Sequence, residues 1–214
     1  MKKQFLALLC IFAMNSIVIA DDLETYLKGK DAEVDSASNL KNEARAVESF
    51  RKAAEQGDAK AQVKLGIAYA TGEGIVKDEV QAVLWFRKAA EQGDAKALVN
   101  LGNMYAEGKG ITRDEARAVE WYRKAAEQGD AKAQYNLGIA YAMGEGILKD
   151  EAQSVVWFRK AAEQGLADAQ YNLGVAYAEG KGITKDDTQA VAWFRKAAEQ
   201  GDSGAQANLR QLSK

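Results

Sequence analysis

The sequence Ala-Ala-Glu-Gln-Gly occurs five times in this chain of 214 residues, and each copy begins 36 residues after the previous one. A unit of this length cannot bury a hydrophobic core alone, so neighbouring units have to stack on one another. The sequence therefore predicts an array of four full units between two half units. The full units are 61–96, 97–132, 133–168 and 169–204, and the half units are 42–60 and 205–214.

Each unit has the pattern of two helices. In the third unit Ala133, Leu137 and Tyr141 recur at every fourth position, which is the spacing of one face of a helix. The second helix is predicted to begin after an aspartate, a residue type that caps helix N-termini, and to stop at the glycine of the repeated sequence. These aspartates are Asp78, Asp114, Asp150 and Asp186. The fold class predicted from these patterns is all-α.

Two further features repeat in phase and predict how the helices pack. Glycine stands in the middle of every first helix, where it costs about 1 kcal/mol relative to alanine. These glycines are Gly66, Gly102, Gly138 and Gly174. Because the cost is repeated, we expect it to have a use, namely close approach of the partner helix backbone. The Trp–aromatic pair of each second helix, such as Trp157-Phe158, shares a face with repeated alanines and is predicted to lie in the core.

The motifs of one unit also resemble those of a known repeat family. The third unit contains Leu137-Gly138-x-x-Tyr141, then Gly144-x-Gly146-Ile147, then Asp150, then Trp157-Phe158-x-Lys160-Ala161-Ala162-x-x-Gly165. This pattern resembles the Sel-one-like repeat, a relative of the tetratricopeptide repeat, and the resemblance covers roughly residues 42–214. It implies a right-handed α-solenoid of antiparallel helix pairs with a concave binding face. Exported bacterial members of that family usually act as adaptors or signalling regulators, and some act in host contact.

The composition excludes several kinds of chemistry. The chain has no histidine and one cysteine, Cys10, so it offers no imidazole base and no cluster of thiolate ligands. We therefore predict no catalytic residue, no cofactor-binding residue and no metal site. The 29 basic and 31 acidic residues form no basic stripe that would attract a phosphate backbone, so nucleic acid is not an expected partner.

Residues 1–20 have the pattern of a cleaved secretory signal peptide. Two lysines precede an apolar run that ends at Met14, and Ala20 suits the position before a signal peptidase cut. We expect an exported protein, periplasmic or secreted, that keeps no stable membrane anchor after cleavage. The segment 21–41 is acidic and does not match the repeat, so it is predicted to be an N-terminal lead-in to a repeat domain at 42–214.

Ligand binding is expected on the first helices of the units, because a residue that is repeated in every unit usually serves the scaffold. By analogy with related repeats, the concave surface includes an asparagine ladder and two tyrosines. The predicted ligand-binding residues are Asn100, Asn103, Tyr135, Asn136, Tyr171 and Asn172. Asparagine amides can donate to and accept from an extended peptide backbone, and tyrosines give rigid contacts. The alternative is that the asparagines are ordinary solvated helix residues and the tyrosines pack on a neighbouring helix.

These observations favour a protein that binds rather than catalyses. We predict a non-enzymatic protein–protein interaction scaffold or regulatory adaptor, whose protein or peptide partner binds the concave face. The alternative is a factor that binds the cell wall (peptidoglycan) or a host surface. An enzyme is least expected, since it would need carboxylate, Ser–Lys or tyrosine chemistry, and no serine lies in a recognised motif.

Overall fold

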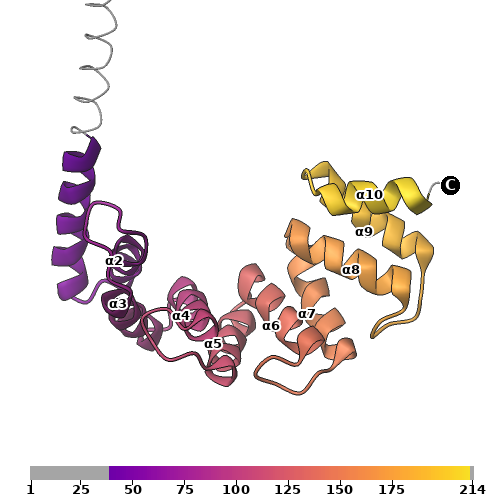
Figure 1. The fold of residues 1–214 in the computed structure, drawn as a ribbon, viewed down its shortest axis with the longest axis horizontal. Coiled ribbons are helices and arrows are strands. Elements are labelled where there is room, and N and C mark those ends of the chain that lie inside the picture. Colours follow the sequence, from indigo (N-terminus) through magenta and orange to yellow (C-terminus); the bar gives the residue numbers. More distant parts are fainter. Residues whose placement is uncertain (1–38, 213–214) are drawn as a thin grey trace, which may run out of the picture.

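The computed structural model describes residues 39–212, and within this range the chain is a curved array of helices without a strand (Figure 1). A helix at residues 39–55 comes first. The helices that follow are α2 (Ala59–Thr71), α3 (Glu79–Glu91), α4 (Ala95–Glu107), α5 (Glu115–Glu127), α6 (Ala131–Met143), α7 (Glu151–Glu163), α8 (Ala167–Glu179), α9 (Asp187–Glu199) and α10 (Ser203–Leu212). The predicted signal peptide, 1–20, and most of the predicted lead-in, 21–41, lie outside the described residues.

Successive helices pack in pairs, and each pair stacks on the next one. Contacts are most extensive within the pairs α2/α3, α4/α5, α6/α7 and α8/α9, and the second helix of each pair also packs on the first helix that follows it. Helices that are distant in the sequence lie far apart along the arc in Figure 1. The predicted all-α solenoid is therefore confirmed.

Aspartate caps set the start of the helices, as predicted for the second helix of each unit. The Asp150 side chain accepts a hydrogen bond from the N–H of Gln153 (2.9 Å), and the equivalent aspartates cap α3, α5 and α9. The N–H of Asp150 donates to the carbonyl of Tyr141 (2.9 Å), so the cap also ties the end of α6 to the start of α7. Aspartates that were not predicted as caps, such as Asp130 on α6, begin several first helices. Leu166 stands at this position before α8 and makes no side-chain capping bond.

The mid-helix glycines make room for an aromatic ring. A Cβ atom on Gly138 would lie 2.6 Å from Cδ1 of Phe158, and an equivalent ring faces the glycine of every other full unit. The expectation that the partner helix backbone approaches at these positions is therefore wrong. Close backbone approach occurs at the loop glycines instead, since a Cβ on Gly146 would lie 2.2 Å from the carbonyl oxygen of Glu115 in the preceding unit. The φ angle of Gly146 is +67°, which also favours glycine.

The core consists of one apolar layer after another along the array. One leucine in the first helix of each full unit is completely buried. The second residue of each Trp–aromatic pair, for example Phe158, is also buried. The tryptophans are only half buried, and a lysine ammonium from the same helix lies over each ring. Lys160 Nζ, for example, lies 4.0 Å from the centroid of Trp157. The predicted core position is thus correct for the second aromatic residue and only partly correct for the tryptophan.

Buried glutamines connect one unit to the next. Gln134 Nε2 donates to the carbonyl of Ala126 (3.2 Å), and Gln164 Nε2 of the following second helix donates to Gln134 Oε1 (2.8 Å). Gln134 is only 5% exposed, so these bonds satisfy polar groups that water cannot reach. The apolar Leu98 occupies the equivalent position in the second unit and is buried as well.

Candidate functional site

All six predicted ligand-binding residues belong to first helices of the units, namely α4, α6 and α8. Asn100 and Asn103 belong to α4, Tyr135 and Asn136 to α6, and Tyr171 and Asn172 to α8. Each of the six is half-buried. These side chains are therefore partly packed into the scaffold and partly available to another molecule.

Asn103 is the centre of a small hydrogen-bond network between units. Its Oδ1 accepts from the Tyr122 hydroxyl (2.8 Å) and from Nδ2 of Asn136 in the next unit (3.3 Å). One unit further along, Nδ2 of Asn172 donates to the Tyr135 hydroxyl (3.4 Å). The scaffold thus uses part of the hydrogen-bonding capacity of these groups, and only the rest can serve a ligand.

The two predicted tyrosines lie against aromatic rings of the second helices. The ring centroids are 5.8 Å apart for Tyr135 and Phe158 and also 5.8 Å apart for Tyr171 and Phe194. Packing on a neighbouring helix, which is the alternative to a binding role, is therefore present. Burial raises the pKa of the Tyr135 hydroxyl, and the Asp168 carboxylate raises this pKa further. The binding role of the six residues stays a prediction.

A pocket of about 320 Å³ opens between α5 and α6 beside two of the predicted residues. Tyr135 and Asn136 line it, and Glu115, Tyr122 and Glu145 line it with them. The sequence did not single out these last three, because Glu115 belongs to a repeated acidic helix start and Tyr122 to a repeated core position. Glu145 had a usable signal, since the charge at its position changes sign from one unit to the next. The four residues at that position are Glu73, Lys109, Glu145 and Lys181.

The junction between the first and second units has a pocket of about 260 Å³ that includes Asn100 and Asn103. The structure therefore places four of the six predicted residues at the edges of pockets, in two adjacent junctions. Tyr171 and Asn172 lie one junction further along, where each contacts an aromatic side chain of a neighbouring helix.

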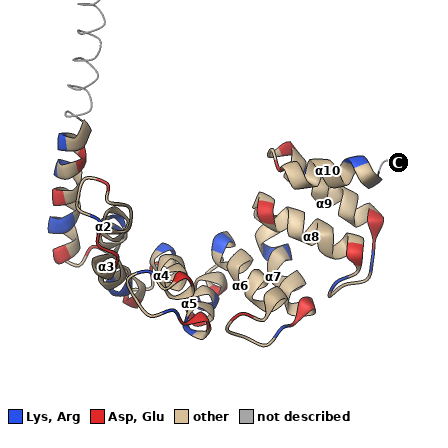
Figure 2. Cartoon of the chain, in the orientation of Figure 1, with Lys and Arg blue, Asp and Glu red and all other residues tan. Residues whose placement is uncertain are grey.

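Basic and acidic residues are both spread along the length of the described array (Figure 2). Within residues 39–212, no group of three or more acidic, cysteine or histidine side chains is placed to hold a metal ion. Over the same residues, none of the helices is both long enough and apolar enough to cross a membrane. The surface thus offers hydrogen-bonding groups and shallow apolar pockets.

Stacked helix pairs of this kind define an α-solenoid, the architecture of helical repeat proteins. The model of the Sel1 repeat family matches residues 40–58, 59–94, 95–130, 131–166 and 167–202. The chain therefore belongs to the Sel1 repeat family, as its motifs implied. Proteins of this family generally mediate protein–protein interactions, and they are typically non-enzymatic scaffolds.

Solved structures include close relatives of this fold. A protective antigen present in uropathogenic Escherichia coli strains, displaying an SLR fold, is 43% identical with a TM-score of 0.75, and the match covers 78% of this chain and 36% of the antigen. A Sel1 repeat protein from Oxalobacter formigenes is 41% identical with a TM-score of 0.74, covering 79% and 50% of the two chains. An immunity protein from Pseudomonas aeruginosa is 26% identical with a TM-score of 0.52, covering 76% and 60%.

The chain thus spans between 36% and 60% of the length of these three relatives. No curated protein sequence matches the chain significantly.

Proposed function

We propose that this protein is a non-enzymatic interaction scaffold or regulatory adaptor that binds a protein or peptide through the surface of α4, α6 and α8. The pocket between α5 and α6 carries the proposal, because the amide of Asn136 and the hydroxyl of Tyr135 border an apolar floor that contains Ile139. This combination suits a peptide, whose backbone needs hydrogen-bond partners and whose side chains need apolar contact.

The experiment replaces Asn100, Asn136 and Asn172 together by alanine and compares partner capture in cells by crosslinking and mass spectrometry. The matched control replaces three exposed glutamates at one repeated position near the ends of the outer helices. These are Glu127, Glu163 and Glu199. We expect the asparagine variant to lose at least about tenfold in captured partner, and the glutamate variant to match the parent. Equal capture by both variants contradicts the proposed surface.

We propose that the protein binds its partner outside the cytoplasm, because residues 1–20 have the pattern of a signal peptide. Mass spectrometry of the protein from fractionated cells should find an N-terminus at Asp21 in the exported fraction. Retention of residues 1–20 in all of the protein contradicts this part of the proposal. Co-sedimentation with purified peptidoglycan, without a protein partner, would favour the cell-wall alternative instead.

A further inference from the structure

Two pockets of the same architecture lie two repeat units apart. The first lies between the helix at residues 39–55 and α2, the second lies between α5 and α6, and their volumes are about 310 and 320 Å³. Every residue that lines the first pocket has an equivalent, two units later in the sequence, that lines the second. The chain therefore builds one structural feature twice.

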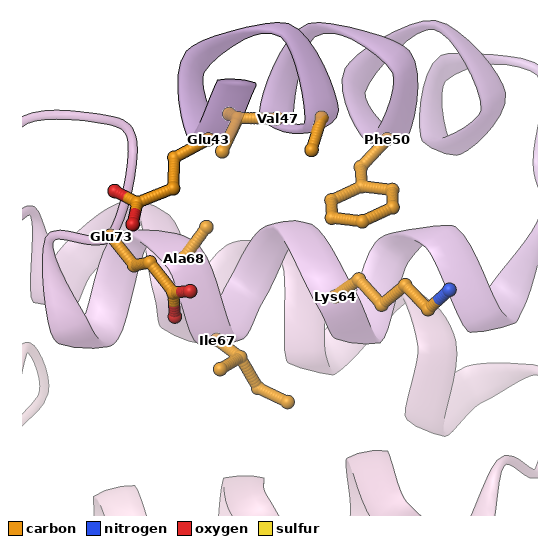
Figure 3. A pocket seen from close by; sticks show the side chains of 8 residues that line it. Glu43, Val47, Phe50, Lys64, Ile67, Ala68 and Glu73 are labelled. Carbon is orange, nitrogen blue, oxygen red and sulfur yellow. The ribbon is translucent and has the colours of Figure 1, made fainter. Parts of the chain in front are cut away.

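The floor of each pocket is apolar. Val47 and Ile67 belong to it in the first pocket, and Val119 and Ile139 occupy the same places in the second. Figure 3 shows the Phe50 ring at one end of the first pocket, facing the helix below it. A floor of this kind contacts the aliphatic part of a side chain rather than a compact ion.

Two glutamates from different units border each pocket. Figure 3 shows Glu43 and Glu73 together at one end of the first pocket, away from the aromatic ring. Glu115 and Glu145 are their equivalents in the second pocket. In the part of the chain that the structure describes, Glu73 and Glu145 form no ion pair. Glu115 is ion-paired with Arg113, which lies two residues before it in the sequence. Each pocket therefore has one glutamate without an ion pair at this end, Glu73 or Glu145. In the first pocket Lys64 also lines the wall, with its ammonium 4.9 Å from the centroid of the Phe50 ring at the other end.

The alternate junctions lack this acidic pair. The position of Glu73 and Glu145 is filled there by Lys109 and Lys181, and each lysine is ion-paired at 2.5 Å with a glutamate at the end of its own first helix. Lys109 lines its junction together with Glu79, so opposite charges meet where the acidic pockets have like charges. Junctions with the same backbone arrangement therefore alternate along the array: one has two glutamates, and the next has a glutamate and a lysine.

We propose that the two acidic pockets bind basic side chains of a peptide, with the ammonium or guanidinium group between the two carboxylates and the aliphatic stem on the apolar floor. Lysine and arginine stems pack on apolar surfaces while the charged group stays at the polar edge. A cation at this end of the pocket meets a glutamate that has no ion pair in the described chain, Glu73 or Glu145, so charge complementarity selects a basic peptide over a neutral one. This inference rests on the proposed function, since it names the chemistry of the peptide partner.

The probe is a short synthetic peptide of alternating lysine and alanine, and its control has glutamine in place of every lysine. Isoleucine methyl signals report the site by NMR. Ile139 lines the acidic pocket between α5 and α6, Ile67 lines the other acidic pocket and also the compensated junction beside it, and Ile111 and Ile183 belong to the loops of the alternate units. We expect the lysine peptide to shift the signals of Ile67 and Ile139 alone, and the glutamine peptide to shift none. No shift at these two residues, or equal shifts at all four, overturns the proposal.

Charge reversal provides the matched variants. Glu73→Lys with Glu145→Lys gives both pockets the residue that the same loop already carries in the alternate units, and we expect the affinity for the lysine peptide to fall by at least about tenfold. Glu91→Lys with Glu163→Lys makes the same change in net charge at two exposed helix ends, and should change the affinity by less than about threefold. Equal losses in both variants overturn the proposal, because they show binding to net charge only.

Far-UV circular dichroism and urea unfolding check that the variants keep the fold, and Glu145→Gln serves as a milder second variant that should weaken binding in the same direction. The same proteins separate this inference from the proposed function. If the partner that is captured in cells is lost by the asparagine variant but kept by Glu73→Lys with Glu145→Lys, the scaffold function stands and the basic-peptide pocket is refuted.

Discussion

Replacing Gly138 by alanine is expected to destabilise the protein, although alanine is the better helix former. Gly138 lies in the middle of α6, where the intrinsic preference for alanine is about 1 kcal/mol. The added Cβ would lie 2.6 Å from Cδ1 and 2.7 Å from Cε1 of Phe158, and this ring is only 5% exposed. Overpacking of a buried site costs about 1–3 kcal/mol, so after the gain in helix propensity we expect a net loss of up to about 2 kcal/mol in the free energy of unfolding.

Urea unfolding followed by circular dichroism measures this loss, and tryptophan fluorescence checks whether the array unfolds in one step. Phe158→Leu, alone and combined with Gly138→Ala, completes a double-mutant cycle. We expect the cost of the alanine to shrink in the leucine background, because the ring that the Cβ meets is gone. A Gly138→Ala variant that is more stable than the parent would refute the reasoning, since helix propensity would then outweigh the contact with the ring.

Three further predictions concern single side chains. Asp130→Ala should lower the free energy of unfolding by about 1 kcal/mol, because a first-turn N–H of α6 loses its cap, whereas Asp130→Asn should stay close to the parent in urea unfolding. Gln134→Leu should cost about 1 kcal/mol by the same assay, because the Ala126 carbonyl and the Gln164 amide each lose one hydrogen bond and keep another, to Gly129, and an unchanged value contradicts this. Burial, and then the charges of nearby glutamates, raise the pKa of Tyr122 above its value of about 10 in the unfolded chain. The stability that this shift contributes is present below about pH 10 and is lost as the pH rises further, so the thermal midpoint of Tyr122→Phe should fall less steeply above that pH than the midpoint of the parent.

The regular part of the fold could be predicted because its determinants are local and repeated. Asp150 and Gly165 bound a predicted helix, and α7 spans Glu151–Glu163 between them. The role of Gly138 could not be predicted in full, because the sequence shows a missing side chain but not the atoms that lie opposite it. Only the packing of α6 on α7 reveals that the ring of Phe158 takes that space.

The candidate site could be predicted to the level of a helix face. The analogy with related repeats predicted that Tyr135 and Asn136 share a surface of α6, and the structure puts both at the edge of a pocket. Their contacts could not be predicted, because the bond from Asn136 to Asn103 crosses a junction between units. The meeting of Glu115 with Glu145 likewise depends on how one unit stacks on the next, which the sequence of a single unit does not specify.

Within residues 39–212 each unit stacks on the adjacent units, and this arrangement has a mechanical consequence. In the described part of the chain the extensive helix contacts lie within a unit or between adjacent units, so a small rotation at one junction meets little resistance elsewhere and the rotations add along the array, as in a spring. The end-to-end span of the arc can therefore change while every single junction stays close to its resting geometry. A partner that binds two distant units at once would fix the distance between the two ends of the arc. A force applied at one end would then be transmitted through the array to the other end.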